Sequence, residues 1–153
     1  MEYVPSSPSL YLEDFQVGQH FSTHPCTIDE KHAVDFARQF DPQPFHLDAS
    51  AARDSFFQGL VTSGWYTAAS TMRMIVDSLP IAGGVIGAGG EVSWPRPTRP
   101  GDILRVEGEI IHIKQSKSHA DRGIVTIRTK TLNQKEEIVQ DMTSKLVVFR
   151  RPN

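Results

Sequence analysis

Hydrophobic and polar positions follow one period in the first half of the chain and another in the second. Between residues 27 and 79 apolar residues recur at helical spacing, and between residues 85 and 149 they alternate with polar ones. Helical spacing places apolar residues on one face of a helix, whereas alternation places them on one face of a strand. The pattern predicts helices followed by long strands, which is an α+β class of fold.

The first half of the chain predicts three helices. Thr27-x-x-Glu30 has the pattern of a capping box and opens a helix that runs to Phe40. The apolar positions of this helix form one stripe, Ala33, Phe36, Ala37 and Phe40. A short helix is expected over residues 49–57, and a long one from Thr62 to Leu79, where Pro80 ends it.

The long helix is apolar on most of its sides. Its expected core face consists of Trp65, Ala68, Ala69, Met72, Ile75 and Val76, and Tyr66 and Met74 make other sides apolar too. Such a helix is expected to be wrapped by other structure.

The second half of the chain predicts four long strands, over residues 85–94, 103–113, 124–132 and 138–149, after a weaker strand over residues 19–26. Glycines at positions 87, 89 and 90 predict a bulge in the first of the long strands. Short turns between long strands indicate an antiparallel meander. We therefore expect one curved antiparallel sheet wrapped around the long helix.

Length and composition indicate one soluble domain over residues 11–153, preceded by an extended segment over residues 1–10. Cys26 is the only cysteine, so no internal disulfide can form, and a cytoplasmic location is expected. The first residues lack the basic and apolar stretches of a signal peptide, and no apolar run reaches the roughly 20 residues that span a membrane. A net charge of -2 gives no reason to expect nucleic acid or an anionic membrane as a partner.

Candidate chemistry is concentrated between Phe40 and Trp65. Pro42 and Pro44 fix their own backbone and disfavour helix in the residues before them, so Asp41 and His46 are expected on a stiff, extended loop. A carboxylate and an imidazole can both act as general acid or base near neutral pH. Gly64 follows a candidate helix cap, Ser63, so its backbone N–H is expected to be unpaired and to point outward.

These residues carry a family resemblance. The run Asp41-Pro42-Gln43-Pro44-Phe45-His46 resembles the Gly-Asp-x-Asn-Pro-x-His signature of MaoC-like dehydratases and R-specific enoyl-CoA hydratases, which have the hotdog fold. Phe40 stands where the family often has glycine, and Gln43 where it often has asparagine. Gly64 matches the glycine whose N–H contributes to the family's oxyanion hole, and Ser63 replaces the histidine that commonly precedes it.

The resemblance implies a hydro-lyase that reversibly hydrates 2-enoyl-CoA, or dehydrates 3-hydroxyacyl-CoA, with (R) stereochemistry. Asp41 and His46 would activate the water and transfer the proton, and the Gly64 N–H would stabilise the thioester oxygen. Gln43, Ser63 and Trp65 are candidates for positioning the substrate. The expected partners are an acyl-CoA or acyl-carrier-protein thioester and further copies of the chain, as a homodimer or a dimer of dimers. No cofactor beyond the coenzyme A of the substrate is expected.

Other interpretations of the same residues stay open. Asp41 could be a turn residue and His46 a packed histidine, as is usual for an arbitrary Asp–His pair. A hotdog acyl-CoA thioesterase and a non-catalytic acyl-binding protein are the alternative functions, the second because of Phe40 and Gln43. His20, His24 and Cys26 lack a further ligand elsewhere in the sequence pattern, so no metal site is expected.

Overall fold

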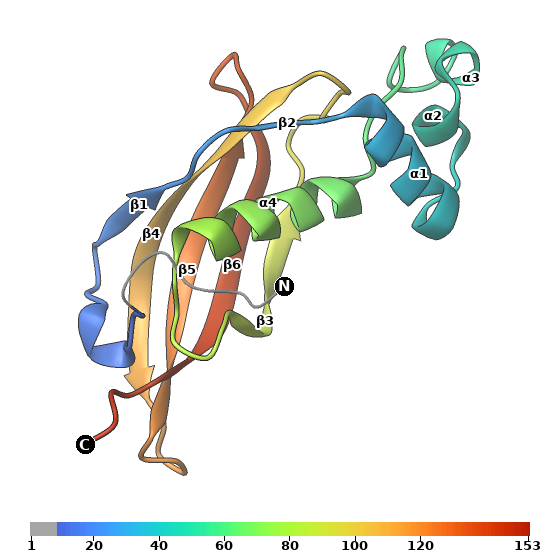
Figure 1. The fold of residues 1–153 in the computed structure, drawn as a ribbon. Coiled ribbons are helices and arrows are strands. Elements are labelled where there is room, and N and C mark those ends of the chain that lie inside the picture. The colour runs from blue at the N-terminus through green and yellow to red at the C-terminus, as the bar shows by residue number, and fades with distance from the viewer. Residues whose placement is uncertain (1–8) are drawn as a thin grey trace.

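A long helix lies across the concave face of one antiparallel sheet in the computed structural model, which describes residues 9–153 (Figure 1). The elements, in chain order, are the 3-10 helix η1 (Leu12–Asp14), β1 (His20–Ser22), β2 (Cys26–Thr27), α1 (Glu30–Phe40), α2 (Pro44–Leu47), α3 (Ala49–Arg53), α4 (Gly64–Ser78), β3 (Ile86–Ser93), β4 (Ile103–Gln115), β5 (Arg122–Leu132) and β6 (Ile138–Phe149). This arrangement confirms the predicted α+β class with a central helix. The predicted extended segment over residues 1–10 falls outside the described residues except at its last two positions, and the division at residue 10 stays a prediction.

The sheet has the strand order β1-β4-β5-β6-β3, with β2 paired to β4, and all of its strand pairs are antiparallel. The three longest strands, β4, β5 and β6, follow one another as the predicted meander. The register of β3 against β6 shifts between Gly87 and Gly89, which confirms the predicted bulge. β3 pairs with β6 alone, so one side of it is a free edge in the described chain.

The core lies between α4 and the sheet. On β4 the apolar side chains Leu104, Val106 and Ile110 are buried and alternate with charged ones, as predicted. They pack with aliphatic side chains of β5 and β6, namely Val125, Ile127, Val139, Leu146 and Val148. Burying one such side chain fully stabilises a fold by about 1.5–3 kcal/mol, so the meander supplies much of the stability of the domain.

The predicted core face of α4 is wrong except at Ile75, which is buried as expected. The residues of α4 that are buried against the sheet are Thr67, Thr71, Met74 and Ile75. Trp65 and Met72, from the predicted face, keep 60% and 57% of their surface exposed. The threonines are polar and were not counted as core residues. The Thr71 hydroxyl can nevertheless be buried because it forms a hydrogen bond with the Thr131 hydroxyl, with the two Oγ1 atoms 2.7 Å apart. The sheet therefore covers a threonine-rich side of the helix.

The end of α1 at Phe40 is as predicted, but its predicted cap and its predicted buried stripe need correction. Asp29, and not Thr27, caps α1, because its carboxylate accepts a hydrogen bond of 3.0 Å from the His32 N–H. Thr27 instead belongs to β2. Phe40 closes α1 with 65% of its surface exposed, so the predicted buried stripe is wrong at that end.

Two further segments are shorter than predicted. The strand expected over residues 19–26 is divided into β1 and β2. Pro25 lies between them and has no N–H to donate to a neighbouring strand. The helix expected over residues 49–57 ends at Arg53, and Gln58 beyond it has a left-handed backbone with φ of 55°.

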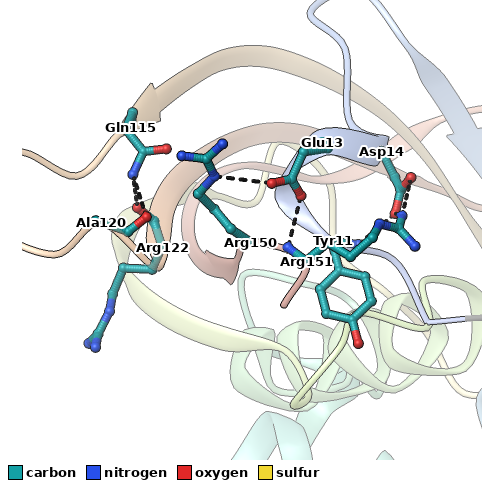
Figure 2. A network of polar contacts seen from close by, with 8 residues as sticks. All are labelled: Tyr11, Glu13, Asp14, Gln115, Ala120, Arg122, Arg150 and Arg151. Atoms are coloured by element: carbon teal, nitrogen blue, oxygen red, sulfur yellow. Dashed lines mark hydrogen bonds and ion pairs between the residues drawn. The ribbon is translucent and has the colours of Figure 1, made fainter. Parts of the chain in front are cut away.

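The start and the end of the described chain are joined by what we call the terminal clasp, made of Tyr11, Glu13, Asp14, Arg150 and Arg151 (Figure 2). The Glu13 carboxylate accepts 3.0 Å hydrogen bonds from Arg150 Nε and from the Arg151 backbone N–H. The Arg151 guanidinium pairs with Asp14 and lies 4.9 Å from the centre of the Tyr11 ring. The Arg151 backbone N–H is the main cause of a lowered pKa of Glu13.

Candidate active site

Asp41 is placed by the end of α1. Its N–H donates to the Ala37 carbonyl at 2.8 Å, and Pro42 follows it, so the helix cannot continue. The extended loop predicted for this stretch is only partly correct, because Pro44 opens the short helix α2, which contains His46. Proline is favoured at a first helical position, where its missing N–H costs nothing.

Asp41 and His46 face each other, with Asp41 Oδ2 and His46 Nε2 3.3 Å apart. The other ring nitrogen, Nδ1, lies 2.7 Å from the Val61 carbonyl oxygen. A carbonyl oxygen can only accept, so Nδ1 carries a proton, and the neutral tautomer that this hydrogen bond selects has its lone pair on Nε2, the nitrogen that faces the carboxylate. His46 is buried, which fixes the ring in this orientation.

Ser63 joins this pair from the start of α4. Its hydroxyl lies 2.7 Å from Asp41 Oδ2, and its oxygen accepts a hydrogen bond of 3.3 Å from the Trp65 N–H as the cap of the helix. Because the oxygen accepts from Trp65, the hydroxyl proton is free to be donated to Asp41. The buried Ser63 therefore caps α4 and holds the Asp41 carboxylate at the same time.

Gly64 is the first residue of α4. Its N–H donates to no protein acceptor within residues 9–153, and the positive end of the helix dipole lies at this point. A Cβ added to Gly64 would lie 2.7 Å from Cε2 of Trp94, so the indole ring occupies the place of a side chain. The result is an unpaired backbone donor at the edge of a cavity.

The side chains of Gln43 and Trp65, the remaining predicted site residues, make no contact with the Asp41–His46 pair among the hydrogen bonds and aromatic contacts of the structure. The Gln43 side chain is exposed and makes no hydrogen bond in the described part of the chain. Its backbone, however, connects the two residues of the pair. The Gln43 N–H donates to the Asp41 carbonyl at 2.7 Å, and the Gln43 carbonyl accepts from the His46 N–H at 2.9 Å. The exposed Trp65 ring packs edge-on against Trp94, with their centres 5.1 Å apart. Gln43 thus braces the pair through its main chain, and Trp65 contacts the cavity wall.

A cavity of about 290 Å³ opens beside His46 and Gly64. Its wall includes Phe45, Phe57, Val61, Thr62, Trp94 and Thr98. A larger hollow of about 750 Å³ lies at the terminal clasp and contains none of the predicted site residues. We take the smaller cavity as the candidate active site because His46, one member of the facing pair, and Gly64 border it. No motif marked Thr62, Trp94 or Thr98 as lining a cavity, because these three positions come together only in the folded chain.

Residues 9–153 contain neither a metal-binding cluster nor a membrane-spanning helix. In that range no three side chains of the metal-binding types histidine, cysteine, aspartate and glutamate gather in one place. No helix in the same range is long and apolar enough to cross a membrane.

Comparison with known proteins gives consistent matches. Residues 14–133 match the family model described as MaoC like domain. The crystal structure of a MaoC-like dehydratase from Rhodospirillum rubrum is 55% identical, with a TM-score of 0.91 over 95% of this chain and all of that one. The unliganded R-hydratase PhaJ1 from Pseudomonas aeruginosa is 28% identical, with a TM-score of 0.77 over 94% of this chain and 88% of that one. The protein YdeM of Bacillus subtilis is 33% identical over 83% of this chain and 90% of its own length. This chain belongs to the MaoC-like family, with the hotdog fold.

Proposed function

We propose that the protein is a hydro-lyase of acyl thioesters, which reversibly hydrates 2-enoyl thioesters to (R)-3-hydroxyacyl thioesters. The observation that carries the proposal is the facing pair Asp41 Oδ2 and His46 Nε2, 3.3 Å apart beside an unpaired Gly64 N–H. Family membership supports a hydratase or dehydratase activity. The similarity to an R-hydratase supports the (R) stereochemistry.

The tautomer of His46 suggests how water would be held. The ionised Asp41 carboxylate and the neutral Nε2 both accept hydrogen bonds, so one water can donate its two hydrogens to them. Its lone pair then points away from the pair, toward C3 of an enoyl group bound in front of it. Ser63 fixes one of the two acceptors by its hydrogen bond to Asp41 Oδ2.

The proposed reaction balances with these groups alone. The water oxygen bonds to C3 while Asp41 or His46 takes its proton, and the electron pair of the double bond moves through C2 onto the thioester oxygen. The Gly64 N–H stabilises that oxygen, and one such donor is typically worth about 10²–10³ in rate. The pair then returns a proton to C2, and dehydration is the reverse sequence.

The substrate is proposed to arrive on coenzyme A or on acyl-carrier protein, in the cytoplasm. The proposed steps use only protein groups, water and the thioester itself, so no separate cofactor enters the proposal. Acid–base catalysis by a positioned side chain contributes roughly 10²–10⁴ in rate, which is the size of effect that this pair would have to supply.

We also propose that the active protein is a homodimer or a dimer of dimers. Trp65, Met72 and Val76 form one exposed apolar stripe on α4, on the side away from the sheet. The free edge of β3 carries the exposed apolar residue Ile86. A stripe of this kind and an unpaired strand edge are features that a second copy of the chain would cover.

The function is tested by following crotonyl-CoA with the purified protein. Loss of the enoyl absorbance without release of free thiol, and with (R)-3-hydroxybutyryl-CoA as the product on chiral analysis, supports the hydratase. Free coenzyme A would identify a thioesterase instead. Binding without any change in the thioester would identify a non-catalytic acyl-binding protein.

A further inference from the structure

A buried glutamine of β6 holds one residue of the wall of the candidate active-site cavity. Gln140 has 0% of its surface exposed, and its Oε1 accepts a hydrogen bond of 2.9 Å from the indole N–H of Trp94. An indole nitrogen can only donate, so the amide must present its oxygen to Trp94. Trp94 directly follows β3 and lines the cavity together with His46 and Gly64. Gln140 is not part of that wall, so it can affect the cavity only through the tryptophan.

The Trp94 ring also packs against the start of α4. A Cβ added to Gly64 would lie 2.7 Å from Cε2 and 2.8 Å from Cδ2, the two atoms that the five- and six-membered rings of the indole share. The centre of the ring lies 5.1 Å from that of Trp65. These contacts are apolar and have little directional preference, whereas a hydrogen bond weakens steeply when its angle changes. Gln140 is therefore the contact that sets the orientation of the ring beside Gly64.

The buried amide of Gln140 is not the side chain that packing alone would favour. Its Nε2 has no hydrogen-bond partner within residues 9–153. Most buried polar atoms are paired, and an unpaired one lowers the stability of a fold. Thr131, directly opposite on β5, has the usual arrangement, since its hydroxyl lies 2.7 Å from that of Thr71. An apolar residue at position 140 would have no unpaired N–H but could not hold Trp94.

We infer that Gln140 is a positioning residue of the proposed hydratase and acts through Trp94. This inference rests on the proposed function, in which the Gly64 N–H receives the thioester oxygen. Because its N–H is held by Gln140, the Trp94 ring gives the cavity a fixed apolar wall beside that donor. A donor stabilises a developing charge only when the reacting oxygen is kept at the correct place. A ring released from Gln140 would leave the thioester free to move away from the Gly64 N–H.

Gln140→Leu removes the acceptor of the indole N–H at comparable volume. We expect kcat for crotonyl-CoA hydration to fall roughly tenfold, less than the ~10²–10³ for a deleted oxyanion donor, because the Gly64 N–H itself remains. KM should change less than kcat, since the affected interaction is made mainly in the transition state. The melting temperature should not fall, because the substitution also removes an unpaired buried N–H.

Thr131→Val is the matched control. It breaks a buried hydrogen bond at the position directly opposite Gln140 and leaves the Thr71 hydroxyl unpaired. We expect this variant to lose stability and to keep the kcat of the wild-type protein, the reverse of the pattern expected for Gln140→Leu. If Gln140→Leu instead loses kcat only together with its melting temperature, the role of Gln140 is structural and the inference is wrong.

Fluorescence follows the ring itself. Trp65 and Trp94 are the only tryptophans of the chain, so in a Trp65→Phe background the emission comes from Trp94 alone. Adding Gln140→Leu should shift this emission to the red and increase its quenching by acrylamide, because the released ring meets more solvent. Adding Thr131→Val should leave both unchanged. An emission that Gln140→Leu does not alter would overturn the inference.

A double-mutant cycle tests whether Gln140 acts through Trp94. Trp94→Phe keeps an aromatic ring but has no N–H for Gln140 to hold. Gln140→Leu should therefore lower kcat no further when it is added to Trp94→Phe. A further loss of roughly tenfold would mean that Gln140 acts by another route, against the inference.

The fluorescence measurement separates failure of this inference from failure of the proposed function. A wild-type protein that does not turn over crotonyl-CoA would overturn the hydratase, and the emission of Trp94 would still decide whether Gln140 holds the ring. Wild-type kcat in Gln140→Leu would overturn the inference and leave the hydratase intact.

Discussion

The Ser63 hydroxyl lies 2.7 Å from Asp41 Oδ2, which joins the first turn of α4 to the carboxylate that follows α1. The same oxygen accepts the Trp65 N–H, so one side chain caps a helix and orients a proposed catalytic group. The carboxylate in turn faces the imidazole of His46, whose far nitrogen is held by the Val61 carbonyl. Each group is fixed by a partner behind it, which is what a preorganised site requires.

Removing either member of the facing pair should abolish most of the proposed activity. We expect Asp41→Asn and His46→Ala each to lower kcat for crotonyl-CoA hydration by about 10²–10⁴, since general acid–base groups contribute that much. The melting temperature should stay near that of the unchanged protein. Lys31→Ala, at an exposed ion pair on α1, is the control and should keep full activity. Near-normal turnover by either variant would show that the residue is structural.

Ser63→Ala tests the positioning of Asp41. The variant keeps both members of the pair but loses the 2.7 Å hydrogen bond to the carboxylate and the cap of α4. We expect kcat to fall by roughly tenfold to a hundredfold, and stability to fall by about 1 kcal/mol from the lost cap. Ser63→Thr, which retains a hydroxyl, should recover part of both. A kcat unchanged in Ser63→Ala would contradict the positioning role.

The packing of Gly64 against Trp94 can be tested with a double-mutant cycle. A Cβ at position 64 would lie 2.7 Å from the indole ring, so Gly64→Ala should destabilise the fold by about 1–3 kcal/mol, the usual cost of overpacking. Trp94→Leu in the same chain should relieve the clash, and the two changes should be non-additive in urea unfolding. Strictly additive free energies of unfolding would show that the two residues do not compete for the same space.

The proposed dimer predicts that a charge on the exposed stripe of α4 separates the subunits. Met72→Glu should convert the protein to a monomer at micromolar concentration in sedimentation velocity, since Met72 is 57% exposed in the single chain and would be buried between copies. Val17→Glu introduces the same charge at another exposed apolar position, on the loop after η1, and should leave the assembly unchanged. If the wild-type protein sediments as a monomer at the same concentration, the proposed dimer is refuted.

The terminal clasp should weaken in acid. The Arg151 backbone N–H and the Arg150 side chain lower the pKa of Glu13 below its ordinary value of 4.5. A lowered folded-state pKa gives stability that is present above the unfolded-state value and is lost as the pH falls through the folded-state value. We therefore expect Glu13→Gln to lower the melting temperature slightly at pH 7, and the difference from the wild-type protein to shrink as the pH falls below 4.5. A difference that stays constant as the pH falls from 7 to well below 4.5 would mean that the charge of Glu13 is not its source.

The four long strands were predictable from the alternation of apolar and polar residues, unlike the divided strand near the start of the chain. Leu104, Val106 and Ile110 recur at every second or fourth position, and β4 buries them as expected. The glycines at 87 and 89 also marked the bulge in β3 correctly. In these segments a shift of one residue would turn the apolar side chains away from the core, so the register of each strand is determined.

The buried face of α4 was not predictable by the same means. Thr67 and Thr71 are polar, so a count of apolar positions assigned the opposite side, where Trp65 and Met72 lie exposed. Apolar residues that pack in the core and apolar residues that a partner chain would cover look alike in a sequence. The hydrophobic pattern therefore does not say which side of the helix faces the sheet.

The candidate site was predictable where a motif fixed it. Asp41 and His46 were found by their spacing, and Ser63 by its place before a helix. The Ser63–Asp41 hydrogen bond and the two threonines of the cavity depend on segments that meet only in the folded chain. Thr62 and Thr98, for example, are joined through backbone atoms that carry no sequence signal.

The terminal clasp lies at the end of the molecule remote from α1, α2 and α3 (Figure 1). A tether added after Asn153 would therefore anchor the protein to a solid support with the Asp41–His46 region facing the surrounding solution. A force on this tether would act first on Arg150 and Arg151, and so on the ion pairs of the terminal clasp, before it acted on α4. Acid, which protonates Glu13, should therefore loosen the anchored end of such an immobilised preparation.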